Sequence, residues 1–226
     1  MGLKIEQLGL CGAGKTTFLN NLAPKIQSEL NLKISYPVKP SSIRIILTLF
    51  KIVLIGLISE PIVFSKFILI AENWWLLKKI AYRHAGIVKR SNEDSILADS
   101  GILQPFISFE IEKNLSDTSI PIRCLLRGCP LPDIIINFHI SPITAKERYE
   151  LRGLRGEGQL IRENSENYFH RAEELHKRLI SYCEEKKIYI IDIDPQYEFT
   201  DKYLKDKLLE IRKVLTEEKK EYEEIL

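Results

Sequence analysis

Short apolar runs bounded by polar or turn-forming residues alternate with longer stretches in which apolar residues recur at helical spacing. The runs predict β-strands near residues 5–10, 32–36, 95–99, 133–138 and 188–193. Helical spacing is clear after residue 17, where Phe18, Leu19 and Leu22 share one face, and again in the C-terminal segment 202–226. This alternation predicts one α/β domain over residues 1–226, with a parallel sheet covered by helices on both faces.

A strongly apolar insert interrupts the alternation at residues 43–90. The segment from Ile43 to Ile58 is almost continuously apolar, and its polar residues Arg44, Thr48 and Lys51 recur at helical spacing. Such a pattern predicts a helix that is buried except along one polar stripe.

A second helical stretch is expected from residue 62 to 82, after a break at Glu60 and Pro61. Charged residues interrupt the apolar run, so neither helix is expected to cross a membrane. The segment 43–75 could instead form a homodimer interface or lie on an anionic membrane as a peripheral contact. We favour the dimer interface, because burial is the commoner explanation of such a composition.

The amino-acid composition limits which binding partners and which cellular compartment are expected. The chain has 226 residues, and 33 Lys and Arg against 31 Asp and Glu give a net charge of only +2, so no nucleic-acid partner is indicated. The four cysteines lack metal-binding spacing, which favours reduced thiols in the cytoplasm. The N-terminus shows no charged-then-apolar signal pattern.

The N-terminal segment G-L-C-G-A-G-K-T-T matches the phosphate-binding P-loop, with Gly9, Gly14, Lys15 and Thr16 at the required spacing. Glycines let the backbone wrap around an anion, the lysine reaches the β- and γ-phosphates of ATP, and the threonine hydroxyl can bind Mg²⁺. A strand before the loop and a helix after it supply the structural context that the motif needs. The predicted ATP-binding residues are Gly12, Ala13, Gly14, Lys15, Thr16 and Thr17, with Thr16 also a Mg²⁺ ligand.

Three arginines follow in a segment that begins as a helix at Pro142 and breaks up at glycines near residue 156. Arg148, Arg152 and Arg155 have the spacing that places them on one helical face. A solvated basic surface would explain them equally well on their own. In a protein with a P-loop, they indicate a lid at residues 148–163 that closes over ATP and neutralises charge during phosphoryl transfer.

Asp99 ends a predicted strand, and the carboxyl ends of parallel strands are where such sheets bind ligands. Its carboxylate could deprotonate or orient an acceptor hydroxyl, or act as a ligand of Mg²⁺. The alternative is a cap on the following helix. We predict that Lys15, Asp99, Arg148, Arg152 and Arg155 form the catalytic group.

The chain resembles the thymidylate kinase branch of the P-loop nucleoside monophosphate kinases. The resemblance rests on the P-loop, on D-S-G-I-L-Q at Asp99 to Gln104, on L-P-D-I-I-I at Leu131 to Ile136, and on S-P-I-T-A-K-E-R-Y-E-L-R-G from Ser141. It implies a five-stranded parallel sheet, ATP with Mg²⁺ as phosphoryl donor, lid arginines and an adenine pocket near Asp194 to Gln196, including Pro195.

The departures from this family lie on the acceptor side. Ser100 stands where the family has an arginine for the acceptor phosphate, and Tyr36 to Pro40 replaces an Arg-Glu-Pro segment. We therefore expect an ATP-dependent phosphotransferase whose acceptor is a small nucleotide or another phosphate- or hydroxyl-bearing molecule, such as a sugar or a lipid-linked compound. The alternative is a nucleotide-controlled binding protein whose apolar insert engages a partner or a membrane surface.

Overall fold

The computed structural model describes residues 3–30, 34–35, 38–88, 95–98, 101–113, 120–154, 165–195 and 200–225. Its strands are β1 (Lys4–Leu8), β2 (Ile34–Ser35), β3 (Ser95–Ala98), β4 (Ile134–Phe138) and β5 (Tyr189–Ile193). Its helices are α1 (Lys15–Leu30), α2 (Ser42–Ser59), α3 (Pro61–Ile68), α4 (Asn73–Val88), α5 (Gln104–Lys113), α6 (Ile122–Leu126), α7 (Pro142–Leu154), α8 (Ser165–Glu185) and α9 (Asp201–Ile225).

All strand pairs in the sheet are parallel, in the order β2-β3-β1-β4-β5. The strand β2 has only two residues, so the four strands of four or five residues form most of the sheet. Leu8 of β1 aligns with Asn137 of β4, which in turn aligns with Asp192 of β5. The carboxyl ends of these three strands therefore meet at one edge, and the predicted α/β fold with a parallel sheet is confirmed.

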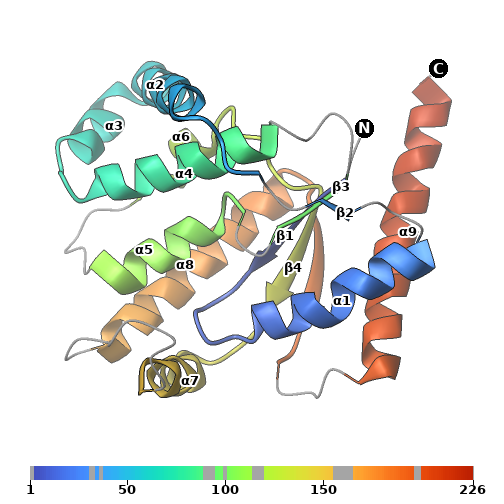
Figure 1. The fold of residues 1–226 in the computed structure, drawn as a ribbon. Coiled ribbons are helices and arrows are strands. Elements are labelled where there is room, and N and C mark those ends of the chain that lie inside the picture. Colours follow the sequence, from blue (N-terminus) through green and yellow to red (C-terminus); the bar gives the residue numbers. More distant parts are fainter. Residues whose placement is uncertain are drawn as a thin grey trace.

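Helices cover both faces of this sheet, as predicted (Figure 1). The helices α1 and α9 pack together on one face, while α4, α5 and α8 form the layer on the other. Phe18 of α1 meets Phe138 of β4 edge-on, with ring centroids 5.5 Å apart, and both rings are fully buried. This contact fixes the first turns of α1 against the strand next to the P-loop.

The helix α2 begins and ends close to the predicted residues, but its surroundings differ from the prediction. Only three of its 18 residues are buried. Thr48, Ile52 and Gly56 form the buried side, which packs against α3, α4 and α6. The expectation of a helix buried except for one polar stripe is therefore wrong for this chain, because its apolar surface is too wide for the three helices that it meets, α3, α4 and α6.

The helix α2 is also long and apolar enough to cross a membrane, with a mean hydropathy of 2.1, by length and composition alone. Charged residues do interrupt the helix, but Arg44 and Lys51 are too few to lower this average. The expectation that composition excludes a spanning helix was therefore too strict.

The helical stretch predicted at residues 62–82 is divided between α3 and α4. The break at Glu60 is as predicted, with Pro61 as the first residue of α3. A second break follows α3, where Asn73 Nδ2 donates to Phe67 O at 2.7 Å and Trp74 Nε1 donates to Ile68 O at 2.9 Å. These side chains satisfy carbonyl groups at the end of α3 and so permit a corner without glycine or proline.

Candidate nucleotide-binding site

The loop between β1 and α1 has the backbone that the P-loop motif predicts. Gly12 and Gly14 have φ angles of 89° and 82°, values that residues with a Cβ rarely adopt. Ala13 donates its N–H to Leu10 O at 3.2 Å, whereas within the described residues the N–H groups of Gly12 and Gly14 donate no hydrogen bond. Such N–H groups at a helix N-terminus suit an anion.

Lys15 is the first residue of α1, and its side chain folds back over this loop. Its Nζ donates to Gly9 O at 2.9 Å and to Leu10 O at 2.8 Å. Thr16 and Thr17 follow in the first turn of α1, where both are exposed. The predicted phosphate-binding residues are thus brought together at the carboxyl end of β1.

The helix α7 packs directly against the loop. A Cβ built on Gly12 would lie 2.5 Å from Ala145 O and 3.3 Å from Arg148 Cβ. The half-buried Arg148 therefore projects from a helix in contact with the P-loop, and Arg152 lies one turn further along, exposed. Arg155 and most of the predicted lid 148–163 lie outside the described residues.

The carboxylate of Glu6, which was not predicted to be a site residue, is buried next to the loop and binds the segment that follows β3. Glu6 of β1 is 3% exposed; its Oε2 accepts from Ile102 N at 3.0 Å, and its Oε1 accepts from Leu103 N at 2.6 Å and Gln104 N at 3.1 Å. Burial raises the pKa of Glu6 to about 7, although these N–H groups and the charge of Arg83 lower it.

Gln104 connects the same region to the P-loop itself, because its Oε1 accepts from Gly9 N at 3.3 Å. Gly101 lies so close to the Glu6 carboxylate that any Cβ at residue 101 would collide with it. Glu6 and Gln104 thus tie the segment after β3 to the P-loop. The sequence offered one signal for the roles of Glu6 and Gln104, because each is a polar residue within an otherwise mostly apolar segment.

Asp99 and Ser100 lie outside the described residues. The strand β3 ends at Ala98, which aligns with Glu6 in the neighbouring strand β1. The end of β3 is therefore next to the strand that leads into the P-loop, while the roles predicted for Asp99 remain predictions.

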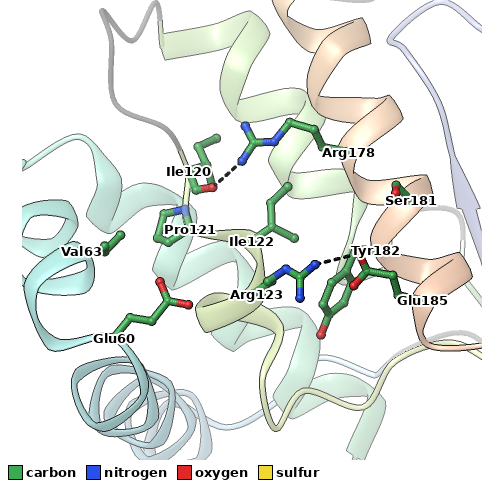
Figure 2. A pocket seen from close by; sticks show the side chains of 10 residues that line it. All are labelled: Glu60, Val63, Ile120, Pro121, Ile122, Arg123, Arg178, Ser181, Tyr182 and Glu185. Carbon is green, nitrogen blue, oxygen red and sulfur yellow. Dashed lines mark hydrogen bonds and ion pairs between the residues drawn. The ribbon is translucent and has the colours of Figure 1, made fainter.

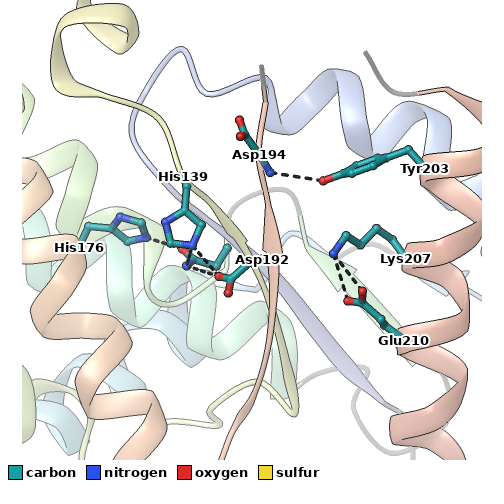
Figure 3. A network of polar contacts seen from close by, with 8 residues as sticks. His139, His176, Asp192, Asp194, Tyr203, Lys207 and Glu210 are labelled. Carbon is teal, nitrogen blue, oxygen red and sulfur yellow. Dashed lines mark hydrogen bonds and ion pairs between the residues drawn. The ribbon is translucent and has the colours of Figure 1, made fainter. Parts of the chain in front are cut away.

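A polar network occupies the carboxyl ends of β4 and β5 (Figure 3). Asn137 Nδ2 donates to Asp192 Oδ1 at 2.8 Å, and Asn137 Oδ1 lies 2.7 Å from His176 Nε2 of α8. His139 Nε2 lies 2.6 Å from Asp192 Oδ1. Burial, together with the charges of His139 and Lys15, lowers the pKa of His176 to about 4, so His176 is neutral near pH 7.

This network lines a cavity of about 460 Å³. The lining residues are Asn137, His139, Ile140, Ser141, Glu173, His176, Lys177, Ile180 and Asp194. Pro195, predicted to flank adenine, is buried directly after Asp194, whose N–H donates to Tyr203 Oη at 3.3 Å. The cavity therefore reaches the segment for which the family resemblance implies an adenine pocket.

The described residues of the loop provide better partners for the phosphates of a nucleoside triphosphate than for a permanently bound metal ion. The N–H groups of Gly12 and Gly14 and the ammonium of Lys15 are suitable partners for phosphate oxygens. No group of three or more His, Cys, Asp or Glu within the described residues could hold a metal ion. Among the described residues, Thr16 is the predicted ligand of a Mg²⁺ ion, which commonly binds to substrate phosphates as well.

No protein-family model and no curated protein sequence matches the chain. Solved structures of deoxyadenosine kinase from M. mycoides are similar to it over 95% of this chain and 100% of theirs. The structure with bound dATP has a TM-score of 0.54 at 19% sequence identity. The structure with the products dCMP and a flexible dCDP has 0.53 at 18%, and that with dCTP has 0.51 at 17%.

At 17–19% sequence identity, this structural similarity shows only that the folds are alike. It supports the P-loop nucleoside kinase fold as a whole and does not single out the thymidylate kinase branch that the sequence resembles. The chain thus shares its fold with these deoxyadenosine kinase structures, and a glycine-rich loop, an arginine-bearing helix and a polar cavity lie at the carboxyl edge of its sheet.

Proposed function

We propose that the protein is an ATP-dependent kinase that transfers the γ-phosphoryl group to a small acceptor. The observation that carries this proposal is the packing of α7 on the P-loop through Gly12, Ala145 and Arg148. Phosphoryl transfer depends chiefly on positioning and on neutralising charge at the phosphates. A phosphate loop that is in direct contact with an arginine-bearing helix can provide both.

Each residue would then have a distinct role. Lys15 would leave Gly9 O and Leu10 O to bind the β- and γ-phosphates, while Arg148, Arg152 and Arg155 would approach from the lid. Thr16 would bind Mg²⁺, which neutralises phosphate charge when it is present. Asp99 would orient or deprotonate the acceptor, or hold a Mg²⁺-bound water.

For the acceptor we propose a deoxynucleoside hydroxyl rather than the phosphate of thymidylate. Two observations support this choice: the similar solved structures are deoxyadenosine kinases, and Ser100 offers only a neutral hydrogen bond where thymidylate kinases have an arginine. Charge-assisted contacts to phosphate are roughly twice as strong as neutral ones, so Ser100 suits an uncharged acceptor better. The proposed partners are thus ATP and this acceptor in the cytoplasm, without nucleic acid.

A nucleotide-controlled binding protein is the second candidate, and the exposed apolar side chains of α2 and α3 favour it. Such a protein would bind ATP through the same loop but would hydrolyse it slowly and without an acceptor.

Acceptor-dependent ADP release distinguishes the two candidates. The purified chain would be given ATP and Mg²⁺ with deoxyadenosine, deoxycytidine, thymidylate, a sugar or no acceptor. We expect ADP with a deoxynucleoside, little with thymidylate, and almost none without an acceptor. An Asp99→Asn variant should lose most of this activity and still bind ATP. Slow ADP release that no acceptor changes would overturn the kinase proposal.

A further inference from the structure

The helices α2 and α3 present a continuous apolar surface that no other described element covers. We define the α2–α3 face by its exposed apolar residues: Ile43 (72%), Ile46 (63%), Leu47 (64%), Phe50 (67%), Leu54 (45%), Ile58 (74%), Ile62 (73%) and Val63 (44%). On α2 these residues recur at helical spacing and form one stripe, opposite the side that packs on α4 and α6. A contiguous exposed apolar surface of this kind marks an interaction site.

Basic side chains border the α2–α3 face. Arg44 and Lys51 are exposed and lie seven residues apart, which places them along one edge of the stripe. Lys66 is exposed on α3. The exposed carboxylates on this part of the chain, Glu60 and Glu72, lie at the helix ends instead.

Two further arginines lie where the α2–α3 corner meets α6 and α8. A cavity of about 360 Å³ opens there, lined by Glu60 and Val63 together with Arg123 and Arg178 (Figure 2). The Arg123 side chain is 70% exposed, and its Nη2 pairs with Glu185 Oε1 at 2.7 Å. Arg178 Nη2 donates to Ile120 O at 3.1 Å. Glu60 and Glu185 balance the two arginines of this cavity, so the basic border of the face consists of Arg44, Lys51 and Lys66.

We propose that the α2–α3 face docks on an anionic lipid bilayer, with α2 lying in the plane of the interface. The apolar stripe would enter the boundary between headgroups and acyl chains, and Arg44, Lys51 and Lys66 would lie at the level of the phosphates. With 18 residues, α2 would make this contact along about 27 Å of helix.

The contacts of α2 with the rest of the domain oppose a membrane-spanning arrangement. Thr48 and Ile52 are 9% and 3% exposed on the side of α2 that packs on α4 and α6, and Ile55 lies so close to Gly128 that an added Cβ there would be 2.9 Å from its Cδ1. A helix that crossed the bilayer would leave these contacts, whereas a helix lying in the interface keeps them.

Charge favours a lipid surface over a second copy of the chain. In a two-fold dimer the same patch meets itself, so Arg44 and Lys51 of both copies would border one apolar interface. Anionic lipid headgroups, in contrast, would place negative charge next to both Arg44 and Lys51. This docking surface does not depend on the proposed kinase activity, because α2 lies away from the P-loop and α7 (Figure 1).

The test is flotation of the full chain with vesicles. One set would contain phosphatidylcholine alone and the other phosphatidylcholine mixed with phosphatidylglycerol. We expect the protein to float with the mixed vesicles at low salt and much less with phosphatidylcholine alone. An Ile46→Ser, Phe50→Ser double variant should lose flotation, whereas Leu209→Ser, a matched change at a 54% exposed residue of α9, should keep it.

A charge variant provides a second test that leaves the apolar stripe intact. Arg44→Gln with Lys51→Gln should weaken vesicle binding on the order of tenfold or more, while Lys202→Gln with Lys205→Gln on α9 should not. No flotation of the wild type, equal flotation of the double apolar variant, or equal binding to uncharged vesicles would overturn the proposal. A dimer that Phe50→Ser dissociates in solution, without vesicle binding, would assign the face to a second copy.

Discussion

Gly12 of the P-loop and Ala145 of α7 are in such close contact that no side chain fits between them. A Cβ on Gly12 would lie 2.5 Å from the Ala145 carbonyl oxygen, well inside van der Waals contact. The same residue has a φ of 89°, so two independent constraints require glycine. The arginine-bearing helix and the predicted phosphate loop are therefore in direct backbone contact.

We predict that Gly12→Ala weakens ADP binding by roughly five- to 150-fold, because backbone strain of this kind costs about 1–3 kcal/mol. Calorimetric titration with ADP measures the effect. Gly128→Ala is the matched control, since Gly128 also has a positive φ of 79° but its Cβ would meet only the tip of the Ile55 side chain. That variant should lose stability and keep its affinity for ADP; equal affinity losses in both variants would refute the specific role of Gly12.

Arg148→Ala should lower kcat on the order of 100-fold and change the affinity for ATP much less, because a lid arginine acts mainly in the closed complex. Arg152→Ala should have an effect in the same direction, although Arg152 is exposed one turn further from Gly12. Steady-state kinetics with a fixed acceptor, together with melting temperatures, provides the measurement. If the substitutions changed the melting temperature but not kcat, both arginines would have a structural role rather than a catalytic one.

Glu6 should make stability depend on pH in a direction that can be stated in advance. Its pKa rises from 4.5 to about 7 on folding, so its contribution is fully present below pH 4.5 and is lost as pH rises through about 7. The loss is on the order of 3 kcal/mol. His84 and His176, whose pKa values fall from 6.5 to about 4, act oppositely and destabilise the fold as pH falls.

A Glu6→Gln variant separates these contributions, because glutamine does not titrate. The free energy of unfolding of the wild type, minus that of Glu6→Gln, should fall between pH 4.5 and pH 8 in urea titrations. A difference that stays constant over this range would show that the carboxylate is not desolvated as the structure indicates.

The sequence predicted those parts of the fold whose signals are local. The P-loop depends on residues 9–17, and proline or aspartate marks the boundaries of the strands β4 and β5. The corner between α3 and α4 was missed because Asn73 closes it with a side-chain hydrogen bond rather than with a glycine or proline. No helices were predicted from the sequence at α5, α6 and α8, although the apolar spacing within α8 is regular.

The remaining differences concern contacts between distant parts of the chain. Glu6 binds backbone groups almost a hundred residues away, and no spacing rule reveals such a partner. The apolar composition of α2 predicted burial, but burial depends on how much surface the neighbouring helices can cover. Here α4 and α6 cover only one side.

The most direct test of the kinase account compares acceptor-dependent ADP release by the wild type with that by Lys15→Met. The Lys15 Nζ donates to the carbonyl oxygens of Gly9 and Leu10 in the loop itself and not to the core of the domain, so the variant should fold with a similar melting temperature. The account predicts ADP and a phosphorylated deoxynucleoside from the wild type, and at least a 100-fold slower reaction from Lys15→Met, roughly the effect of losing one charged transition-state contact. Equal turnover by the two proteins would contradict it.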